Sequence, residues 1–211
     1  MMTAPEILLI DHSQAISRAV TLIESGGLIA FPTDTVYGIG VSVFLASAID
    51  RVYEVKARSM QKAIPVLLGD PQTAEQITPP LSPIVKRLGK MFWPGPLTLV
   101  VPLLPSLPEN LSPTPTIGLR VPDHPFTRAM LQETGPLAAT SANRSGDPSA
   151  LTAAQVQSQL GTQVDLILDG GRSPGEVAST VLDCTGDKPV ILREGPLPWE
   201  DILGAIQDLI S

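Results

Sequence analysis

Cysteine, aromatic residues and long apolar runs are scarce or missing in this sequence. Its 211 residues include 4% aromatic side chains and one cysteine, Cys184, so no disulfide can form within the chain. No apolar run approaches the roughly 18–20 residues of a membrane-spanning helix. The N-terminal MMTAPEILLIDHSQ lacks the basic segment and apolar core of a secretory signal. We therefore expect a cytoplasmic protein with no membrane partner and with Cys184 buried and inert.

Positive charge is also in deficit. The chain has 14 Lys and Arg against 21 Asp and Glu, a formal net charge of −7. This balance argues against nucleic-acid binding driven by bulk charge. A local basic face for tRNA or double-stranded RNA stays open, because six cations fall within one short stretch: Lys56, Arg58, Lys62, Lys86, Arg87 and Lys90.

Several familiar signatures of catalytic and cofactor sites are absent. Neither GxGxxG nor GxxxxGK[ST] occurs, so a Rossmann fingerprint and a P-loop are excluded. The two histidines, His12 and His124, do not have zinc-ligand spacing. No GxSxG elbow accompanies the serines, which disfavours a hydrolase triad.

The segments that are present alternate between short apolar runs and amphipathic stretches, which predicts an α/β fold with a mixed sheet. We expect a single domain over residues 1–211. The predicted strands are 28–32, 64–68, 97–103, 117–121, 137–140, 164–168, 178–183 and 189–193. The predicted helices are 14–25, with Ser13 as its N-cap, and 46–57, 82–91, 125–134, 152–160 and 199–210.

A polar cluster follows the first predicted strand, in the segment LIAFPTDTVYGIG (28–40). Hydroxyls, a carboxylate and a phenol come directly after Pro32 and are closed by two glycines: Thr33, Asp34, Thr35, Tyr37, Gly38 and Gly40. A strand that ends in such a loop commonly builds a ligand site, because the strand fixes the backbone and the loop presents hydrogen-bonding groups. A well-capped turn is the alternative.

Basic side chains occupy two further positions of interest. Lys56 and Arg58, with Lys62 close behind, sit at a predicted helix end, where a turn could direct them onto a phosphate or carboxylate. A solvated helix terminus is the alternative. Arg120 alternates with apolar neighbours on its strand, so it is a carboxylate clamp if that face lines a cleft and a surface charge otherwise.

Small polar residues also gather at the ends of later strands. The run TSANRSG (140–146) could bind phosphate or ribose hydroxyls, or could form an ordinary turn before the next helix. We interpret Phe92-Trp93 and the following PGPLT as structural. Ser179 and Arg193 lie at strand edges near the C-terminus.

Taken in order, PTDTVYG, KAR, PGPLT, GLRVP, TSANRSG, STV and LREG resemble the Sua5/YrdC/TsaC family, over about residues 13–211. The length resembles the single-domain type. The resemblance implies a YrdC-like twisted sheet flanked by helices, with a concave ligand cleft. It also implies a nucleotidyltransferase that makes threonylcarbamoyl-AMP and pyrophosphate from L-threonine, bicarbonate and ATP. Downstream transferase proteins of the family then modify an adenosine of tRNA to its threonylcarbamoyl form (t6A).

The resemblance also implies roles for individual residues. The threonine site would comprise Thr35, Arg120, Ser179 and the backbone around Ala139. The ATP phosphates would meet exposed catalytic Lys56 and Arg58 together with Lys62, and Mg²⁺ would arrive with ATP. The nucleotide would be held by Arg58, Lys62, Ser141, Asn143, Ser149 and Arg193.

Two alternative hypotheses for the function remain. A YciO-like relative without this activity resembles the chain in PTD and GLRVP, although such relatives tend to lose the KAR pair and the SAN triplet. An RNA-binding module would use the basic stretch 56–90 and would bind without ATP, with an affinity that falls steeply as salt is added.

Overall fold

The computed structural model describes residues 4–57, 59–175 and 177–210, so Arg58, a predicted catalytic residue, lies outside the described residues. Ten strands form one sheet: β1 (Glu6–Leu9), β2 (Ile29–Phe31), β3 (Gly38–Ser42), β4 (Val66–Leu67), β5 (Leu97–Pro102), β6 (Thr116–Arg120), β7 (Leu137–Ser141), β8 (Leu166–Asp169), β9 (Thr180–Asp183) and β10 (Val190–Arg193). In the same described ranges, six α-helices accompany these strands: α1 (Ala15–Glu24), α2 (Ala46–Lys56), α3 (Pro83–Phe92), α4 (Pro125–Thr134), α5 (Ala153–Leu160) and α6 (Trp199–Ile206). Within the described chain, no helix is both long and apolar enough to cross a membrane.

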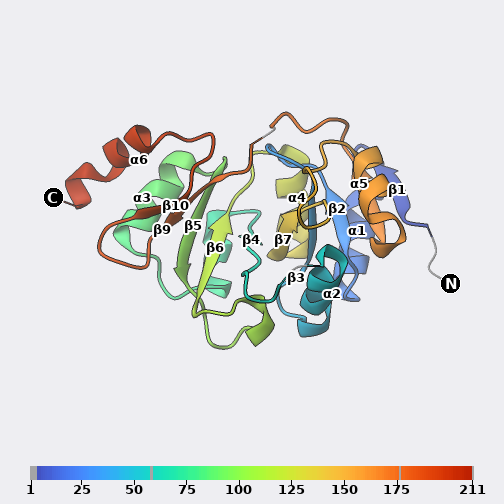
Figure 1. Ribbon diagram of the computed structural model, residues 1–211, viewed down its shortest axis with the longest axis horizontal. Coiled ribbons are helices and arrows are strands. Elements are labelled where there is room, and N and C mark those ends of the chain that lie inside the picture. Colours follow the sequence, from blue (N-terminus) through green and yellow to red (C-terminus); the bar gives the residue numbers. More distant parts are fainter. Residues whose placement is uncertain (1–3, 58, 176, 211) are drawn as a thin grey trace.

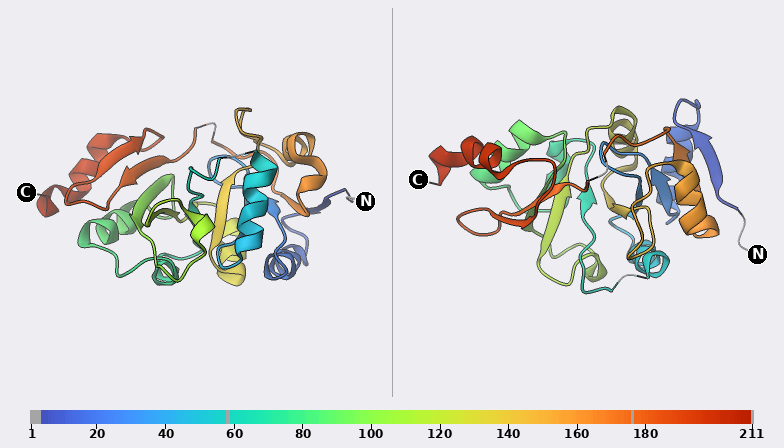
Figure 2. Two further views of the ribbon diagram at one scale, coloured as in Figure 1. Left: turned by 60° about the horizontal axis from the view of Figure 1, so that its bottom comes forward. Right: turned by 45° about the horizontal axis from the view of Figure 1, so that its top comes forward.

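The strand order is β1-β8-β2-β3-β7-β4-β6-β5-β9-β10. Four neighbouring pairs are parallel (β1–β8, β2–β8, β4–β6 and β5–β9) and the others are antiparallel. The predicted α/β fold with a mixed sheet is therefore confirmed. In Figure 1, β1 and α5 lie at one end of the molecule and α3 and α6 at the other, and Figure 2 shows the same order from two further sides.

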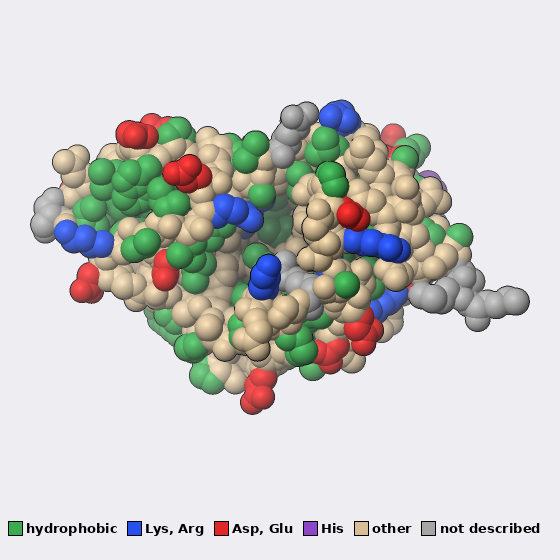
Figure 3. Space-filling view, viewed as in Figure 1, with side chains coloured by type: hydrophobic (Ala, Val, Ile, Leu, Met, Phe, Trp, Pro, Cys, Tyr) green, Lys and Arg blue, Asp and Glu red, His purple; other side chains and the backbone are tan. Residues whose placement is uncertain are grey.

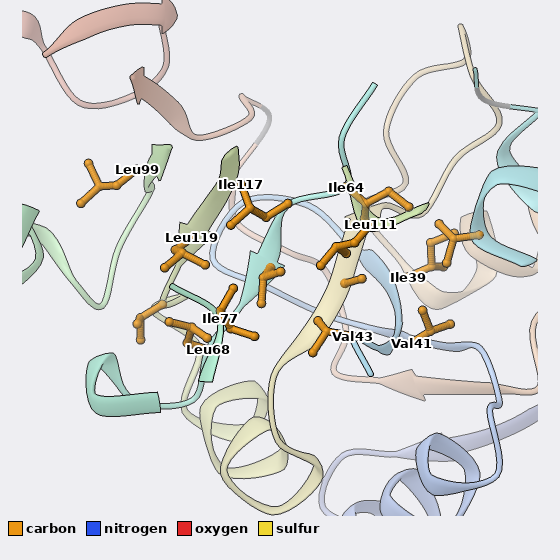
Figure 4. Packing of buried hydrophobic residues seen from close by; sticks show 14 of the residues in the cluster. Ile39, Val41, Val43, Ile64, Leu68, Ile77, Leu99, Leu111, Ile117 and Leu119 are labelled. Carbon is orange, nitrogen blue, oxygen red and sulfur yellow. The ribbon is translucent and has the colours of Figure 1, made fainter. Parts of the chain in front are cut away.

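Apolar side chains pack on both faces of the sheet. On β2, Ile29 and Phe31 belong to the cluster that α1 and α4 cover, whereas Ala30 belongs to the larger cluster on the opposite face. Figure 4 shows part of that larger cluster, in which side chains from different strands, such as Ile39 of β3 and Ile117 and Leu119 of β6, belong to one apolar layer. Burying a side chain of this size stabilises the fold by about 1.5–3 kcal/mol.

Two strands were not predicted. The segment Glu6–Leu9 forms β1 beside β8, and Gly38–Ser42, interpreted as the end of a polar loop, forms β3. Glycine is normally depleted in strands, but here Gly38 and Gly40 lie against the Phe31 ring. A Cβ added at either position would come within 3.3 Å and 3.1 Å of ring carbons, respectively.

Element boundaries differ modestly from the prediction. The predicted strand 64–68 pairs only at Val66–Leu67, and the predicted helix 199–210 ends at Ile206 and continues as a short 3₁₀ turn. The predicted N-cap was wrong: Gln14, not Ser13, caps α1, and without a side-chain hydrogen bond. The structural interpretation of Trp93 is confirmed, because it is buried and its indole N–H donates to the carbonyl of Leu97 at 2.7 Å.

Candidate ligand pocket

A pocket of about 440 Å³ opens across the middle of the sheet. Figure 3 shows a hollow near the centre of this face, with Lys or Arg side chains beside it. Residues of β3 to β7, β9 and β10 contribute to its lining, so both halves of the sheet build it. It brings together seven of the predicted site residues: Thr35, Arg120, Ala139, Ser141, Ser149, Ser179 and Arg193.

Arg120 is fixed at the base of this pocket and is 7% exposed. Its Nη2 donates to Asp34 Oδ1 at 2.6 Å, and the side chains of this ion pair are 8% and 13% exposed. Its Nη1 donates to Thr35 Oγ1 at 3.1 Å and its Nε to the carbonyl of Gly95 at 3.1 Å. Of the two alternatives for Arg120, a carboxylate clamp in a cleft or a surface charge, the structure favours the first, because Arg120 lines the pocket.

The polar loop after β2 is held by its own hydroxyls. Thr33 Oγ1 donates to the carbonyl of Val36 at 2.6 Å and lies 3.0 Å from Thr35 Oγ1. Thr127, in the first turn of α4, donates to the carbonyl of Pro32 at 2.6 Å. These contacts fix the backbone of the loop, so the loop is a rigid wall of the pocket.

His124 caps α4 behind this loop. Its Nδ1 accepts from the Thr127 N–H at 3.4 Å. Burial lowers the pKa of His124, while the charges of Asp34 and Asp123 oppose that shift. Asp34 is therefore near enough to act on both His124 and Arg120.

Ser179 and Arg193 form the opposite wall. Ser179 Oγ lies 2.8 Å from Thr98 Oγ1. The Arg193 guanidinium donates twice to the Ser179 carbonyl, from Nε at 3.0 Å and Nη2 at 2.8 Å. Burial lowers the pKa of Arg193, and the positive charge of Arg120 lowers it further. Two guanidinium groups therefore share one pocket, and Asp34 pairs with Arg120.

Lys56 was expected at an exposed, phosphate-facing position, and that expectation of exposure was wrong. The side chain is 3% exposed, and its Nζ donates to the carbonyls of Ser141 (2.7 Å) and Asn143 and to Asn143 Oδ1 (3.3 Å). Ala57 follows in the left-handed region (φ 46°), so the expected turn at the end of α2 is present. Lys56 therefore ties α2 to the loop after β7.

The loop after β7 is further organised by Asn143. Its Nδ2 donates to the carbonyls of Arg144 and Asp147, both at 2.8 Å, so this side chain serves the turn. Ser141 and Ser149, from the two ends of the same loop, line the pocket. Lys62 is exposed and directly precedes Ala63, which also lines the pocket.

A strap, residues 170–175 and 177–179, connects β8 to β9 and crosses beside the pocket (Figure 1, orange). Tyr37 holds its start, with Oη donating to the Gly171 carbonyl at 2.7 Å and accepting from the Gly170 N–H at 3.1 Å. Burial raises the pKa of this phenol to about 12. Gly175 packs on the polar loop, since an added Cβ would lie 2.7 Å from Thr35 Cα.

Sequence reasoning left Asp34 and Tyr37 without roles and did not single out Thr98. Only the fold reveals that Asp34 reaches Arg120, which is 86 positions away, and that Tyr37 reaches Gly171, which is 134 positions away. The PGPLT motif contains Thr98, but its interpretation as purely structural was wrong for this residue, which lines the pocket beside Ser179.

The sequence profile of the Sua5/YciO/YrdC family, described as "Telomere recombination", matches residues 21–195. A Mycobacterium tuberculosis protein named putative threonylcarbamoyl-AMP synthase is 41% identical over 193 residues, covering 91% of this chain and 89% of that protein. The chain belongs to this family, and the resemblance seen in its motifs is confirmed.

Solved structures agree. The crystal structure of Pyrococcus abyssi Sua5 complexed with L-threonine matches with a TM-score of 0.87 and 36% identity over 90% of this chain. The match covers 57% of that protein, so this chain spans little more than half of its length. E. coli YciO matches with a TM-score of 0.83 and 28% identity, over 94% of this chain and 97% of its own.

Proposed function

We propose that this chain synthesises threonylcarbamoyl-AMP from L-threonine, bicarbonate and ATP, with release of pyrophosphate. The observation that carries the proposal is the single pocket that gathers seven residues predicted from the motifs. The relatives named for this activity and the Pyrococcus Sua5 complex with L-threonine support the same assignment.

The threonine carboxylate would bind at Arg120. Three of the five guanidinium N–H groups are used, one each from Nε, Nη1 and Nη2. One N–H on each terminal nitrogen has no partner among the described residues, which is the number that a bidentate carboxylate takes. Thr35, Ser179 and the apolar Ala139 line the space beside it.

The nucleotide would extend past Ser141 and Ser149. Its phosphates would meet Arg193, Lys62 and Arg58, the last of which follows α2 in the sequence. Lys56 and Asn143 would act by holding the loop that carries Ser141. In the described parts of the chain, no group of three or more His, Cys, Asp or Glu could hold a resident metal. We therefore propose that Mg²⁺ enters the pocket bound to the phosphates of ATP.

The lining suggests how the reaction proceeds. Among the described lining residues there is no His, Asp or Glu, and the phenol of Tyr37 is bonded to the strap. The deprotonated threonine amine would attack bicarbonate, with loss of water, or CO₂, with loss of a proton to solvent, to give a carbamate. A carbamate oxygen would then bond to the α-phosphorus as the bond to pyrophosphate breaks. The pocket contributes positioning and positive charge rather than a general base.

A YciO-like relative is the second candidate, because E. coli YciO shares the fold at a TM-score of 0.83. Sequence favours the synthase, since identity is 41% to the mycobacterial relative and 28% to YciO. The KAR and SAN motifs, which such relatives tend to lose, are present at 56–58 and 141–143.

The test is pyrophosphate release from MgATP and bicarbonate in the presence of L-threonine, with D-threonine as the matched control. We expect release that depends on the L-isomer. Release that is absent, or equal with D-threonine, would refute the synthase. Cytoplasmic location and any direct RNA contact belong to the same proposal, as does product transfer to tRNA by partner proteins. Product transfer is tested by reconstituting t6A on a tRNA transcript with the family's transferase proteins.

A further inference from the structure

Among the residues that the structure describes, Asp34 is the one carboxylate bonded to Arg120, the candidate threonine clamp. Its Oδ1 accepts from Arg120 Nη2 at 2.6 Å, and its side chain is 13% exposed. Burying a carboxylate and a guanidinium costs desolvation energy that the pair recovers only with good geometry and further hydrogen bonds. Here those bonds exist, because Thr35 and the Gly95 carbonyl occupy two further guanidinium donors.

The guanidinium is therefore held at three points along its length, on Nε, Nη1 and Nη2. A planar group fixed in this way cannot turn about its own axis without breaking at least two bonds. The remaining N–H on each terminal nitrogen then has a set direction. A bidentate clamp needs that fixed direction, because two parallel hydrogen bonds form only when the planes of the two groups coincide.

Asp34 itself is held in place by its surroundings. The strap packs on its backbone, since a Cβ added at Gly175 would lie 3.0 Å from the Asp34 carbonyl oxygen. Its charge also offsets part of the repulsion between Arg120 and Arg193, which share the pocket.

We propose that Asp34 is a positioning residue that orients Arg120 for the substrate carboxylate and does not itself touch the reacting atoms. This inference rests on the proposed function and deepens it, because it assigns the geometry of the threonine clamp to a carboxylate that the motif analysis left without a role. Loss of the Asp34 charge should weaken threonine binding selectively, because ATP meets other residues.

The test compares Asp34→Asn with Asp165→Asn by steady-state kinetics and thermal unfolding. Asp165 is a matched control, because it pairs with Arg51 at 2.6 Å outside the pocket. For Asp34→Asn we expect the KM for L-threonine to rise about tenfold or more, with the KM for ATP within about twofold of wild type. For Asp165→Asn we expect a lower Tm and unchanged KM values.

Failure of this inference is distinguishable from failure of the proposed function. Equal changes in both KM values, or an unchanged threonine KM in an active Asp34→Asn variant, would show that Asp34 is merely structural. If the wild type lacks threonine-dependent turnover, calorimetric titration with L-threonine alone decides instead. Binding by the wild type that weakens tenfold in Asp34→Asn supports the positioning role; equal binding, or none by either protein, overturns it. Should Asp34→Asn be unfolded, Asp34→Glu, which keeps the charge, is titrated in its place and must retain measurable threonine binding.

Discussion

Lys56 is a residue whose surroundings differ from those that its position suggests. A lysine in the last turn of a helix is usually solvated, with its charge favoured by the helix dipole. Here the ammonium is buried and donates to backbone carbonyls of the loop after β7. Its absence would remove this donor from both carbonyls, of which the one of Ser141 would still accept from the Asn143 N–H at 3.0 Å.

We therefore expect Lys56→Met, which keeps most of the aliphatic volume, to lower the free energy of unfolding by about 1–3 kcal/mol. Turnover should fall as well, since this loop directly follows Ser141, the last residue of β7, which lines the pocket. Urea denaturation monitored by tryptophan fluorescence measures the first effect. Lys86→Met, on the exposed side of α3, is the matched control. Equal stability of the two variants would mean that the buried contacts of Lys56 contribute nothing.

Ionisation of Cys184 lowers the stability of the protein at alkaline pH. Burial raises the pKa of its thiol from the ordinary 9.0 to about 12, and the charge of Asp183 adds to the shift. Above pH 9 the thiol ionises in the unfolded chain while it stays protonated in the folded one. The free energy of unfolding contributed by this group is thus complete below pH 9 and is lost as pH rises toward 12.

Urea denaturation at pH 8 and pH 10 should reveal this loss. We expect the wild type to lose roughly 1 kcal/mol more than Cys184→Ala between the two pH values. Tyr37, whose pKa is also raised to about 12, contributes equally to both proteins and cancels. Parallel losses in wild type and variant would contradict the assigned burial of the thiol.

At the scale of elements, the sequence predicts those helices and strands that local patterns define and misses those that depend on tertiary contacts. The ten-residue helix Pro125–Thr134 was predicted to the residue, because Pro125 and the apolar spacing define it locally. Strand β3 was missed because its glycines make sense only against Phe31, seven to nine positions earlier. The same holds at the site, where the motifs gave roles to Arg120 and Ser179 but none to their partners Asp34 and Thr98.

The strap packs so closely on the polar loop that Gly175 leaves no room for a methyl group. A Cβ at Gly175 would lie 2.7 Å from Thr35 Cα and 2.9 Å from the Thr35 carbonyl oxygen, so backbone would have to move. We expect Gly175→Ala to destabilise the fold by about 1–3 kcal/mol and to raise the KM for L-threonine, because the displaced loop carries Thr35. Thermal unfolding and steady-state kinetics measure the two effects.

The control is Gly186→Ala in the turn between β9 and β10, where an added Cβ meets nothing within 4 Å. This variant should unfold at the wild-type temperature and keep the wild-type KM. If Gly175→Ala also keeps the wild-type unfolding temperature and KM, the strap can shift without loss of stability and does not hold the polar loop in place.

At the scale of the whole molecule, the shortest strand of the sheet lies at the pocket. Strand β4 has two residues, and it joins β7 on one side to β6 on the other. Two further backbone bonds flank it, from the Leu68 N–H to the Arg120 carbonyl at 2.9 Å and from the Ala139 N–H to the Pro65 carbonyl at 2.8 Å. The order of strands that creates this seam depends on long-range pairing, which local sequence patterns do not encode.

A ligand in the pocket would bridge this seam, because Thr35 and Ser141 line it from one half and Arg120, Ser179 and Arg193 from the other. We expect each of the two ligands, L-threonine and MgATP, to stabilise the protein by about 2.7 kcal/mol when it is present at 100 times its own dissociation constant. Hydrogen exchange should slow most at the seam amides, Leu68 and Ala139. The amide of Ile10, which bonds to Asp169 at the distant β1 edge, serves as the internal reference. Protection that rises equally at all three amides would indicate global stabilisation alone and would contradict a ligand that spans the two halves of the sheet.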